Sequence, residues 1–337
     1  MTSIKQQLQD ILAKRIMLID GAMGTMIQTY KLTEEDYRGE RFKNFEHSVK
    51  GNNDLLVLTQ PQIISAIHEQ FLEAGADILE TNTFNAQAIS MEDYKMTDLV
   101  YEMNLEAAKI AKAAAAKYSA LNPQKTRFVA GAMGPTTKLS SMSPDVNNPG
   151  FRSVTFNELV EAFTEQAKGL LDGGVDMLLL ETVTDTLNVK AGLFAINKLK
   201  EERGIDIPVM VSGTITDNSG RTLSGQTPEA FWYSVSHADL LSIGLNCALG
   251  AKDMIPHISE LSKVAWAYTT AYPNAGLPNE FGQYDESPEA MAKVVEEFMA
   301  QGWVNMVGGC CGTLPAHIKA IADIAVKYAP RQVPVLA

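Results

Sequence analysis

The stretch GADILET at residues 75–81 is echoed by GVDMLLLET at residues 174–182. In both copies a glycine follows a segment of helical periodicity, and a short apolar run then leads to Glu-Thr. A second pair, GAMG at residues 21–24 and again at 131–134, follows two other apolar runs. A helix end, a glycine and a buried strand in this order are the repeating unit of a parallel α/β sheet. The repeats therefore predict a chain built from βα units.

The same alternation of short apolar runs and helical segments recurs eight times. The predicted strands are Ile16–Asp20, Asp77–Thr81, Arg127–Gly131, Asp176–Glu181, Val209–Gly213, Leu240–Asn246, Ala265–Ala271 and Trp303–Gly308. The predicted helices are Gln62–Ala74, Leu99–Tyr118, Phe156–Leu171, Thr186–Arg203, Pro228–His237, Ala251–Lys263, Pro288–Gln301 and Pro315–Tyr328. Three of these helices have a hydroxyl side chain and a proline near their start: Thr59 with Pro61, Thr227 with Pro228, and Ser287 with Pro288.

Eight such units over about 330 residues predict an α/β fold of the (β/α)₈ TIM barrel type. No low-complexity linker divides the chain, so we expect a single domain. We assign residues 1–330 to the barrel and residues 331–337 to a C-terminal tail or the start of a linker to further modules.

Two connections are much longer than the others, and both follow the carboxyl end of a strand. They span residues 25–60 and 136–155 and are rich in Asn, Pro, Ser and Gly. Long loops on this side of a barrel often serve as lids or docking surfaces. Plain solvated insertions are the other interpretation, and the sequence does not choose between them.

The composition excludes several classes of partner. The chain has 337 residues, 46% of them hydrophobic, and a net charge of −12, with no run of Lys and Arg that could follow a phosphate backbone. The first ten residues lack an apolar signal region, and no window approaches the ~18 consecutive apolar residues of a membrane span. We therefore expect a cytoplasmic protein that binds neither nucleic acid nor a membrane.

The carboxyl ends of the predicted strands carry the candidate chemistry, since barrel active sites lie at this end. The segments there are Asp20-Gly21, Thr81-Asn82-Thr83, Gly131-Ala132, Glu181-Thr182, Ser212-Gly213-Thr214, Asn246-Cys247, Tyr272-Pro273-Asn274 and Gly309-Cys310-Cys311-Gly312. All three cysteines of the protein are among them, at the ends of the sixth and eighth strands. Their placement predicts that they meet at one point of the rim.

Three thiolates on one centre are the ligands of a zinc ion that keeps a fourth position for another ligand. Cys310 and Cys311 are adjacent, so both can reach one metal only where the backbone bends, and Gly308, Gly309 and Gly312 permit that bend. Two simpler interpretations are buried, unreactive cysteines and a vicinal disulfide between Cys310 and Cys311. A reducing compartment disfavours the disulfide.

The ligand set also indicates a type of reaction. Three anionic thiolates around a divalent zinc leave a net charge of −1, which makes the metal a poor Lewis acid toward water. Such a centre suits the binding of a substrate thiol, whose pKa it lowers while the sulfur stays electron-rich enough to attack.

An amino-acid thiol would also need contacts for its ammonium and carboxylate groups. Asp20 and Glu181 are the rim carboxylates best placed for the ammonium, and the backbone N–H groups of Gly21 and Ala22 could hold the carboxylate. The alternatives are a turn or cap role for Asp20, a buried hydrogen-bonded acid for Glu181, and simple capping for Thr81 and Thr83.

Histidine offers no competing metal site. His68, His237, His257 and His317 fall on predicted helices, and His47 falls in a loop. We interpret each as a helix-surface or loop residue rather than a ligand.

Four of these segments together resemble the motifs of the homocysteine S-methyltransferase family. They are Ile19-Asp20-Gly21-Ala22-Met23-Gly24-Thr25, Glu80-Thr81-Asn82-Thr83-Phe84, Gly244-Leu245-Asn246-Cys247 and Gly308-Gly309-Cys310-Cys311-Gly312-Thr313. The match runs nearly end to end. It implies that Cys247, Cys310 and Cys311 hold zinc, and that Asp20, Thr81 and Glu181 help to seat homocysteine.

Three other segments resemble, more narrowly, the homocysteine-binding module of cobalamin-dependent methionine synthases. They are Gly51-Asn52-Asn53-Asp54-Leu55-Leu56, residues 212–227 with Thr222-Leu223-Ser224-Gly225-Gln226-Thr227, and Pro273-Asn274-Ala275-Gly276-Leu277-Pro278. This resemblance implies that methylcobalamin, held by another module and regenerated from methyltetrahydrofolate by a further one, is the methyl donor. Neither module is in this sequence, so we expect a fragment of a larger enzyme or a separate subunit.

Several alternatives stay open beside this interpretation. The donor could instead be S-methylmethionine or another onium compound, and a non-catalytic zinc-binding docking barrel belongs to a different functional class. Asn274 or a water could fill the fourth zinc position before the substrate arrives. One departure from the family pattern is Ala22, where a second glycine is usual; its methyl group fits only if its φ is negative.

Overall fold

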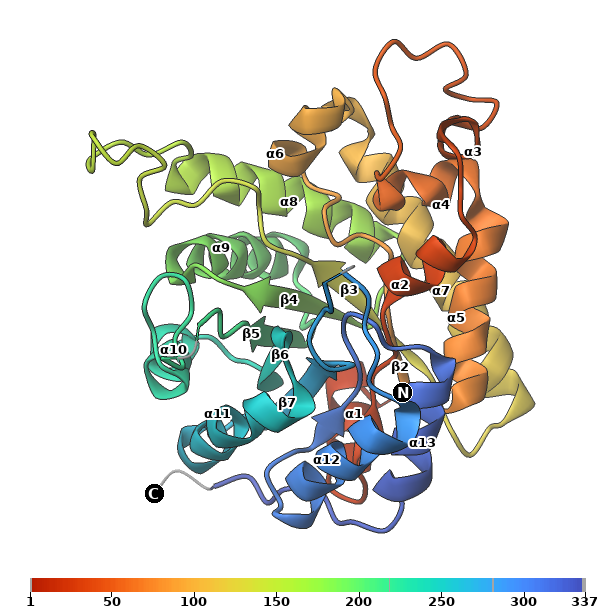
Figure 1. Cartoon of the computed structure of the whole chain (residues 1–337), viewed down its shortest axis with the longest axis vertical. Coiled ribbons are helices and arrows are strands. Elements are labelled where there is room, and N and C mark those ends of the chain that lie inside the picture. The colour runs from red at the N-terminus through yellow and green to blue at the C-terminus, as the bar shows by residue number, and fades with distance from the viewer. Residues whose placement is uncertain (1, 218, 281, 335–337) are drawn as a thin grey trace.

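The computed structural model describes residues 2–217, 219–280 and 282–334, and its eight strands confirm the predicted barrel (Figure 1). The strands are β1 (Met17–Leu18), β2 (Ile78–Glu80), β3 (Phe128–Met133), β4 (Met177–Val183), β5 (Val209–Gly213), β6 (Ser242–Gly250), β7 (Tyr268–Asn274) and β8 (Met306–Val307). All ladders are parallel, in the order β1-β8-β7-β6-β5-β4-β3-β2. A bridge between Ile19 and Ile78 joins the two ends of this sheet. The result is a (β/α)₈ TIM barrel.

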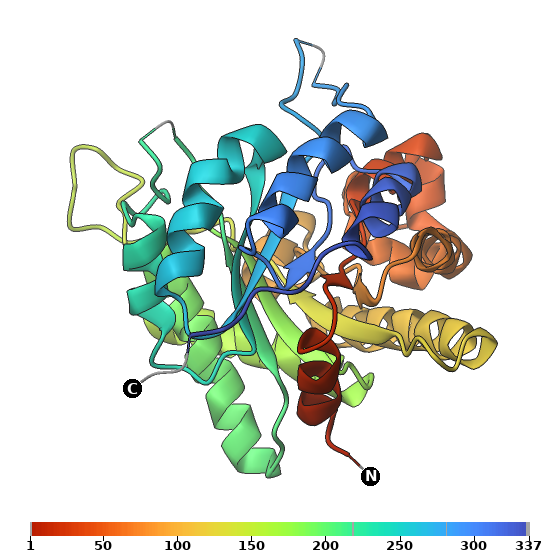
Figure 2. The ribbon, with the colours of Figure 1, turned by 90° about the horizontal axis from the view of Figure 1, so that it is seen from below.

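One long helix follows each strand and packs outside the barrel (Figures 1 and 2). In chain order these helices are α5 (Pro61–Ala74), α7 (Val100–Leu121), α8 (Phe156–Asp172), α9 (Thr186–Arg203), α10 (Pro228–Val235), α11 (Ala251–Val264), α12 (Pro288–Ala300) and α13 (Pro315–Ala325). The remaining elements are α1 (Ile4–Leu12), α2 (Met23–Thr29), α3 (Glu34–Arg38), η1 (Asn53–Leu55), α4 (Leu56–Thr59), α6 (Ala88–Met91), η2 (Glu92–Tyr94) and η3 (Thr97–Leu99).

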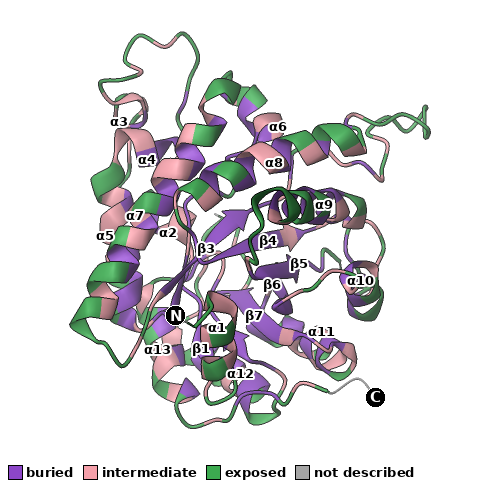
Figure 3. Cartoon of the chain, turned by 180° about the vertical axis from the view of Figure 1, so that it is seen from behind, coloured by how far each residue is buried: buried purple, intermediate pink, exposed green. Residues whose placement is uncertain are grey.

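Two apolar cores hold the barrel together. The larger lies between the strands and the surrounding helices, and Figure 3 shows buried strands inside helices whose outer faces are exposed. The smaller fills the barrel interior and includes Ile78, Leu179 and Met210. Leu8 and Leu12 of α1 belong to this inner core, so α1 closes the amino-terminal end of the barrel. The sequence did not predict this helix.

The repeated Asp of the opening pattern has a structural role at the amino-terminal end of the barrel. Asp77 Oδ2 accepts a hydrogen bond from the N–H of Leu18 at 2.8 Å, and Asp176 Oδ2 accepts one from the N–H of Val129 at 2.8 Å. Each carboxylate therefore fastens the start of its own strand to the neighbouring strand that precedes it in sequence. Asn305 repeats the contact before β8, because its Oδ1 accepts from the N–H of Thr269 at 3.0 Å.

Some predicted boundaries and caps were wrong. β7 begins at Tyr268 rather than Ala265, because the N–H of Ala265 bonds to the Leu261 carbonyl and ends α11. β6 continues past its predicted end, Asn246, to Gly250. Thr227 and Ser287 cap their helices through their side chains as predicted, whereas Thr59 ends α4 and Gln60 precedes α5.

The two long connections differ in structure. Residues 25–60 contain α3, η1 and α4, and Leu55, Leu56 and Val57 join the outer core, so the interpretation as a plain solvated insertion was wrong here. Residues 136–155 form no helix or strand, and their loop projects beside α8 (Figure 1). Ser140 and Ser141 fasten its base to α9 through Asn188 and Asp185.

The chain still contacts the barrel after residue 330, where the predicted tail begins. Arg331 is buried and donates hydrogen bonds to the carbonyls of Ser262, Ala265 and Ala267. Residues 335–337 of the predicted tail lie outside the described residues. Among the described residues, no helix is both long and apolar enough to cross a membrane.

Candidate active site

The cysteines lie at the carboxyl ends of β6 and β8, where two irregular backbone segments present them. In β6, Asn246 pairs with Tyr272 and Gly250 pairs with Asn274. Between these two pairs β6 advances by four residues and β7 by only two. The extra residues bulge, and Cys247 and Ala248 have φ values of 58° and 55°. Left-handed backbone is costly for residues with a side chain and is concentrated at functional sites. The bulge turns Cys247 toward β8.

The three sulfur atoms converge as the sequence predicted. All three Sγ atoms lie within 4.8 Å of one another, and Cys247 Sγ is 3.7 Å from Cys311 Sγ. Two sulfurs bound to one tetrahedral zinc at ~2.3 Å would be about 3.8 Å apart, whereas a disulfide needs about 2.0 Å. The cysteines are free thiols and only half-buried. The donor set therefore fits a zinc ion.

A tight turn lets the adjacent Cys310 and Cys311 serve the same centre. The Cys310 N–H donates to the Pro273 carbonyl at 2.8 Å, while the Cys311 carbonyl accepts from the Ala275 N–H at 2.9 Å. Gly312 then adopts a φ of 81°, and a Cβ there would lie 2.2 Å from Cβ of Tyr284. Glycine is thus required at this position both for its conformation and for its size.

The proximity of the thiols changes their acidity. Hydrogen bonds from Cys247 and Cys310 lower the pKa of Cys311 to about 3. Hydrogen bonds to the other two thiols raise the pKa of Cys310 well above its usual value. One negative charge is therefore shared among three sulfurs, and a cation is needed to ionise all of them.

Carboxylates form the other half of the site. Asp20 and Glu181 are both buried, and Glu181 interacts electrostatically with Asp20, Glu80 and Cys311. Asp20 Oδ2 accepts a hydrogen bond from the N–H of Glu80 at 3.1 Å, while Asp20 Oδ1 has no partner among the described residues. The structure thus brings the two predicted carboxylates together and adds Glu80 as a third.

Burial sets the protonation of these acids. Burial and the Glu80 charge raise the pKa of Asp20 well above its usual range, and burial raises the pKa of Glu80 to about 8. Burial and the neighbouring carboxylates also raise the pKa of Glu181 well above its usual range. A bound cation such as an ammonium group would favour the ionised forms. This cluster is suited to a positively charged ligand.

The other candidate residues have partners within the protein. The N–H of Ala22 donates to Thr313 Oγ1 at 3.1 Å, and its φ of −67° accommodates the methyl group. Thr81 Oγ1 contacts Thr83 Oγ1 at 2.6 Å and accepts from the N–H of Ala132 at 2.9 Å. Gly21, directly after Asp20, packs closely against Phe71. Asn274 ends β7, and its buried Oδ1 has no partner among the described residues.

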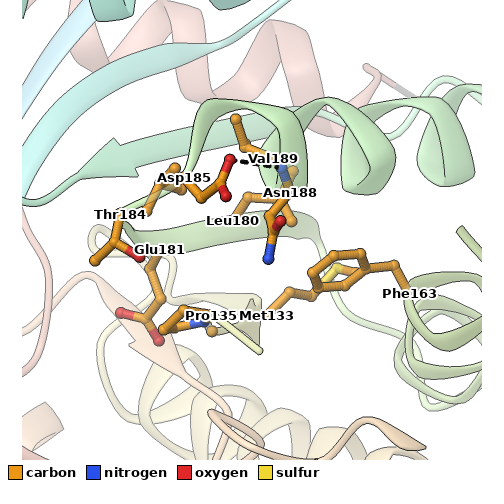
Figure 4. Close-up of a pocket in the computed structure, with 11 residues that line it drawn as sticks. Met133, Pro135, Phe163, Leu180, Glu181, Thr184, Asp185, Asn188 and Val189 are labelled. Carbon is orange, nitrogen blue, oxygen red and sulfur yellow. Dashed lines mark hydrogen bonds between the residues drawn. The ribbon is translucent and has the colours of Figure 1, made fainter. Parts of the chain in front are cut away.

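A small cavity lies beside Glu181, between β4 and the helices α8 and α9. Its volume is about 20 Å³, room for one water molecule but not for an amino acid. Figure 4 shows Glu181 next to Pro135, with Asp185 and Asn188 farther toward α9. Most of its lining is apolar, with Met133, Phe163 and Leu180 among the residues, and it is not itself the substrate site.

Sequence reasoning missed three residues of the site. Glu80 lies two positions after the inward-facing Ile78, so strand alternation could have revealed it. Asn246 was noted only as a rim residue, although its Nδ2 donates to Cys310 Sγ at 3.8 Å. Tyr284, whose hydroxyl hydrogen-bonds Cys311, comes from the loop between β7 and α12, and no sequence signal placed it there.

The described histidines contribute no nitrogen to the cysteine triad, but their predicted surface positions were partly wrong. His68 is fully buried in α5, and burial lowers its pKa to about 4. His317 is buried as well: its Nδ1 accepts from the N–H of Leu314, and its Nε2 contacts the Glu286 carbonyl. His47 and His237 are exposed. A helix that packs against neighbouring helices as well as the barrel buries some polar side chains, and the sequence pattern alone does not show which ones.

Comparison with known proteins identifies the fold and the family. A structure of the homocysteine methyltransferase MmuM from Escherichia coli in its metallated form is similar, with a TM-score of 0.73 and 19% identity, over 95% of this chain and 99% of that chain. The oxidized form of the same protein gives a TM-score of 0.73 and 18% identity over 96% and 99%. The family model described as homocysteine S-methyltransferase matches residues 17–325. This chain belongs to the homocysteine S-methyltransferase family, and it is a methyltransferase.

Proposed function

We propose that this chain binds zinc through Cys247, Cys310 and Cys311 and transfers a methyl group to homocysteine, forming methionine. The observation that carries the proposal is the convergence of three sulfur atoms within 4.8 Å at the carboxyl end of the barrel. A zinc ion held there lowers the pKa of a substrate thiol and keeps its sulfur nucleophilic. The half-buried cysteines leave that sulfur accessible to a methyl donor.

The residues around the triad would orient the substrate. Asp20 and Glu181 are proposed to hold the ammonium group, since both carboxylates are buried close to the triad and Asp20 Oδ1 lacks a partner among the described residues. The backbone of Gly21 and Ala22 is proposed to face the carboxylate group, with the Ala22 N–H held by Thr313 Oγ1 and Thr81 supporting this side of the site. The unpartnered Oδ1 of Asn274 is the proposed fourth zinc ligand in the absence of substrate.

The proposed methyl donor is methylcobalamin, carried by a cobalamin-binding module with a methyltetrahydrofolate-binding module to regenerate it. The narrower resemblance of residues 51–56 and 273–278 supports this donor. The homocysteine sulfur forms a bond to the methyl carbon while the bond between that carbon and the donor breaks. The donor keeps the electron pair, and the thiol proton is released to solvent.

The zinc assignment predicts a specific loss of metal. Zinc content should fall sharply in Cys310→Ala, because two thiolates hold zinc far more weakly than three. Ser242→Ala is the matched control: Ser242 lies at the other end of β6, and its buried hydroxyl has no partner among the described residues. Metal analysis of both purified variants is the measurement. A Cys310→Ala protein with full zinc and full activity would disprove the assignment.

Substrate binding is tested by zinc-edge X-ray absorption. Homocysteine should add a fourth sulfur ligand and release about one proton per site. If zinc binds but homocysteine leaves its coordination unchanged, the chain is a docking barrel rather than an enzyme of this reaction. An assay with free methylcobalamin in parallel with S-methylmethionine identifies the donor, because an onium-dependent enzyme would use only the second.

A further inference from the structure

Two backbone bulges flank β5 at the rim of the barrel, and each presents one half of the proposed substrate site. In β4, Leu180 pairs with Val211 and Val183 with Gly213, so β4 takes three steps where β5 takes two. Glu181 and Thr182 occupy this bulge, and Thr182 has a left-handed φ of 52°. The second bulge, in β6, carries Cys247. Bulges at a barrel rim re-aim side chains, and here they aim a carboxylate and a thiol.

The side chain of Asn246 connects these two bulges. Asn246 is fully buried, and its Oδ1 accepts hydrogen bonds from the N–H of Thr182 at 3.1 Å and from Ser212 Oγ at 2.6 Å. Its Nδ2 donates to Thr182 Oγ1 at 2.8 Å and faces Cys310 Sγ at 3.8 Å. A backbone N–H can only donate, so the Thr182 contact fixes which end of the amide faces the sulfur.

We infer that Asn246 is a positioning residue that fixes the spacing between the sulfur anchor and the ammonium anchor of the substrate. This inference rests on the proposed function. The Asn246 side chain contacts Thr182, which follows Glu181, and it also contacts Cys310 of the triad. Asn246 directly precedes Cys247 in the chain, so the same residue also positions that cysteine. A site with a fixed spacing selects an amino acid with two methylene groups between its sulfur and its α-carbon, and it disfavours cysteine, which has one.

The strained backbone explains why such a connection is needed. Thr182, Cys247 and Ala248 all adopt left-handed conformations, which persist only where the surroundings hold them. Asn246 also accepts a hydrogen bond from Thr214 Oγ1 at its own carbonyl, at 2.5 Å. All four polar sites of its amide are engaged, and removing them would free both bulges together.

The test measures how well the cobalt-substituted protein distinguishes two thiols. Cobalt(II) in a sulfur site absorbs visible light, so titration with homocysteine and with cysteine gives a dissociation constant for each, without catalysis. In Asn246→Ala, and in the near-isosteric Asn246→Asp, which loses the N–H facing Cys310, the preference for homocysteine over cysteine should fall by about tenfold or more. Ser212→Ala breaks one bond to Asn246 but leaves both anchors connected, so it should retain the preference.

The outcomes separate this inference from the proposed function. If the Asn246 variants bind homocysteine and cysteine more weakly by the same factor, the positioning role is overturned. A loss of stability alone does not alter the preference between the two thiols. Asn246→Asp is close in size to asparagine and keeps the test decisive if Asn246→Ala does not fold. If no thiol changes the wild-type spectrum, the proposed function fails and the inference fails with it. A wild-type response with unchanged selectivity in the variants overturns the inference alone.

Discussion

Glu80 is a partly buried acid at the carboxyl end of β2, and it acts on both of the other carboxylates of the site. It lies between Asp20, which accepts a hydrogen bond from its N–H, and Glu181, whose pKa its charge raises. Tyr272 is buried in the same region, and burial together with the charges of Glu80 and Glu181 raises the pKa of its hydroxyl well above its usual value. Three acids gathered at this rim, with little access to water, are unfavourable for stability. A ligand with a positive charge offsets part of that cost, as expected for a substrate site.

The raised pKa of Glu80 predicts a pH-dependent effect of Glu80→Gln on stability. In the folded protein this pKa is about 8, above the 4.5 of an unperturbed glutamate. As the pH rises from about 5 to about 8, the unfolded chain has lost this proton while the folded chain keeps it. The wild type should therefore lose stability relative to Glu80→Gln as the pH rises through this interval, by on the order of 1 kcal/mol per pH unit.

Urea unfolding of both proteins at several pH values measures this difference. Glu73→Gln, which changes an exposed glutamate on α5, serves as the control and should show no such slope. Parallel pH profiles for Glu80→Gln and the wild type would show that Glu80 is ionised in the folded protein.

The turn between β8 and α13 is the element on which the metal site depends most. It places Cys310 and Cys311 next to each other, and its conformation is fixed from several sides. The Gly312 N–H donates to Thr25 Oγ1 at 3.0 Å, and Thr313 Oγ1 donates to the Cys310 carbonyl at 2.7 Å. The first and last βα units of the barrel thus meet at the cysteine pair.

Gly312→Ala should remove zinc and destabilise the protein. The new methyl group would strain a φ of 81° and would lie 2.2 Å from Cβ of Tyr284. We expect a loss of at least about 2 kcal/mol together with a low zinc content. Metal analysis and thermal unfolding are the measurements.

Gly302→Ala is the matched control, because Gly302 has a φ of 67° and no atom lies within 4 Å of the position that the new methyl group would take. It should cost about 1 kcal/mol and keep zinc. Equal zinc contents in the two variants would contradict the role assigned to the turn.

The segment Gly51–Leu56 has a structural role between two loops. Tyr37 donates to Asn53 Oδ1 at 2.7 Å, Asn82 Nδ2 donates to the Asn53 carbonyl at 2.8 Å, and Asp54 Oδ1 accepts from the N–H of Asn85 at 3.0 Å. The segment therefore fastens the connection after β1 to the connection after β2. Its distinctive sequence reflects these contacts as well as any contact with a partner.

At the scale of the whole molecule, the closure of the barrel depends on the junction of β1 and β2. Here the chain has short strands and one bridge, and Asp77 supplies the additional contacts. Its carboxylate accepts from the N–H of Leu18 and pairs with Arg15 at 2.8 Å. Lys125 and Arg127 approach the same carboxylate at 3.4 and 3.9 Å.

Asp77→Ala should open this junction and cost about 3–5 kcal/mol, because it leaves the largely buried Arg127 without its counter-charge. Asp77→Asn keeps an acceptor for Leu18 and should cost less. Asp239→Ala removes an exposed ion pair with Lys5 and should cost under about 1 kcal/mol. Chemical denaturation of the three variants checks this order. A cost for Asp77→Ala no larger than for Asp239→Ala would contradict the role of the junction.

The sequence by itself determined the barrel, its eight units and the three cysteines of the site. Local periodicity and glycine placement mark each βα unit, and a barrel brings the carboxyl ends of all strands to one rim. That geometry is general, so Cys247 and Cys310 could be placed together although they lie on different strands.

Tertiary structure alone decided how those side chains are aimed. The bulges in β4 and β6, the connection through Asn246 and the third carboxylate, Glu80, depend on contacts between strands that are distant in sequence. Burial of His68 and closure by α1 depend in the same way on neighbours from elsewhere in the chain. Sequence periodicity reports which face of an element is apolar, whereas strain, burial and pKa arise only when the elements pack.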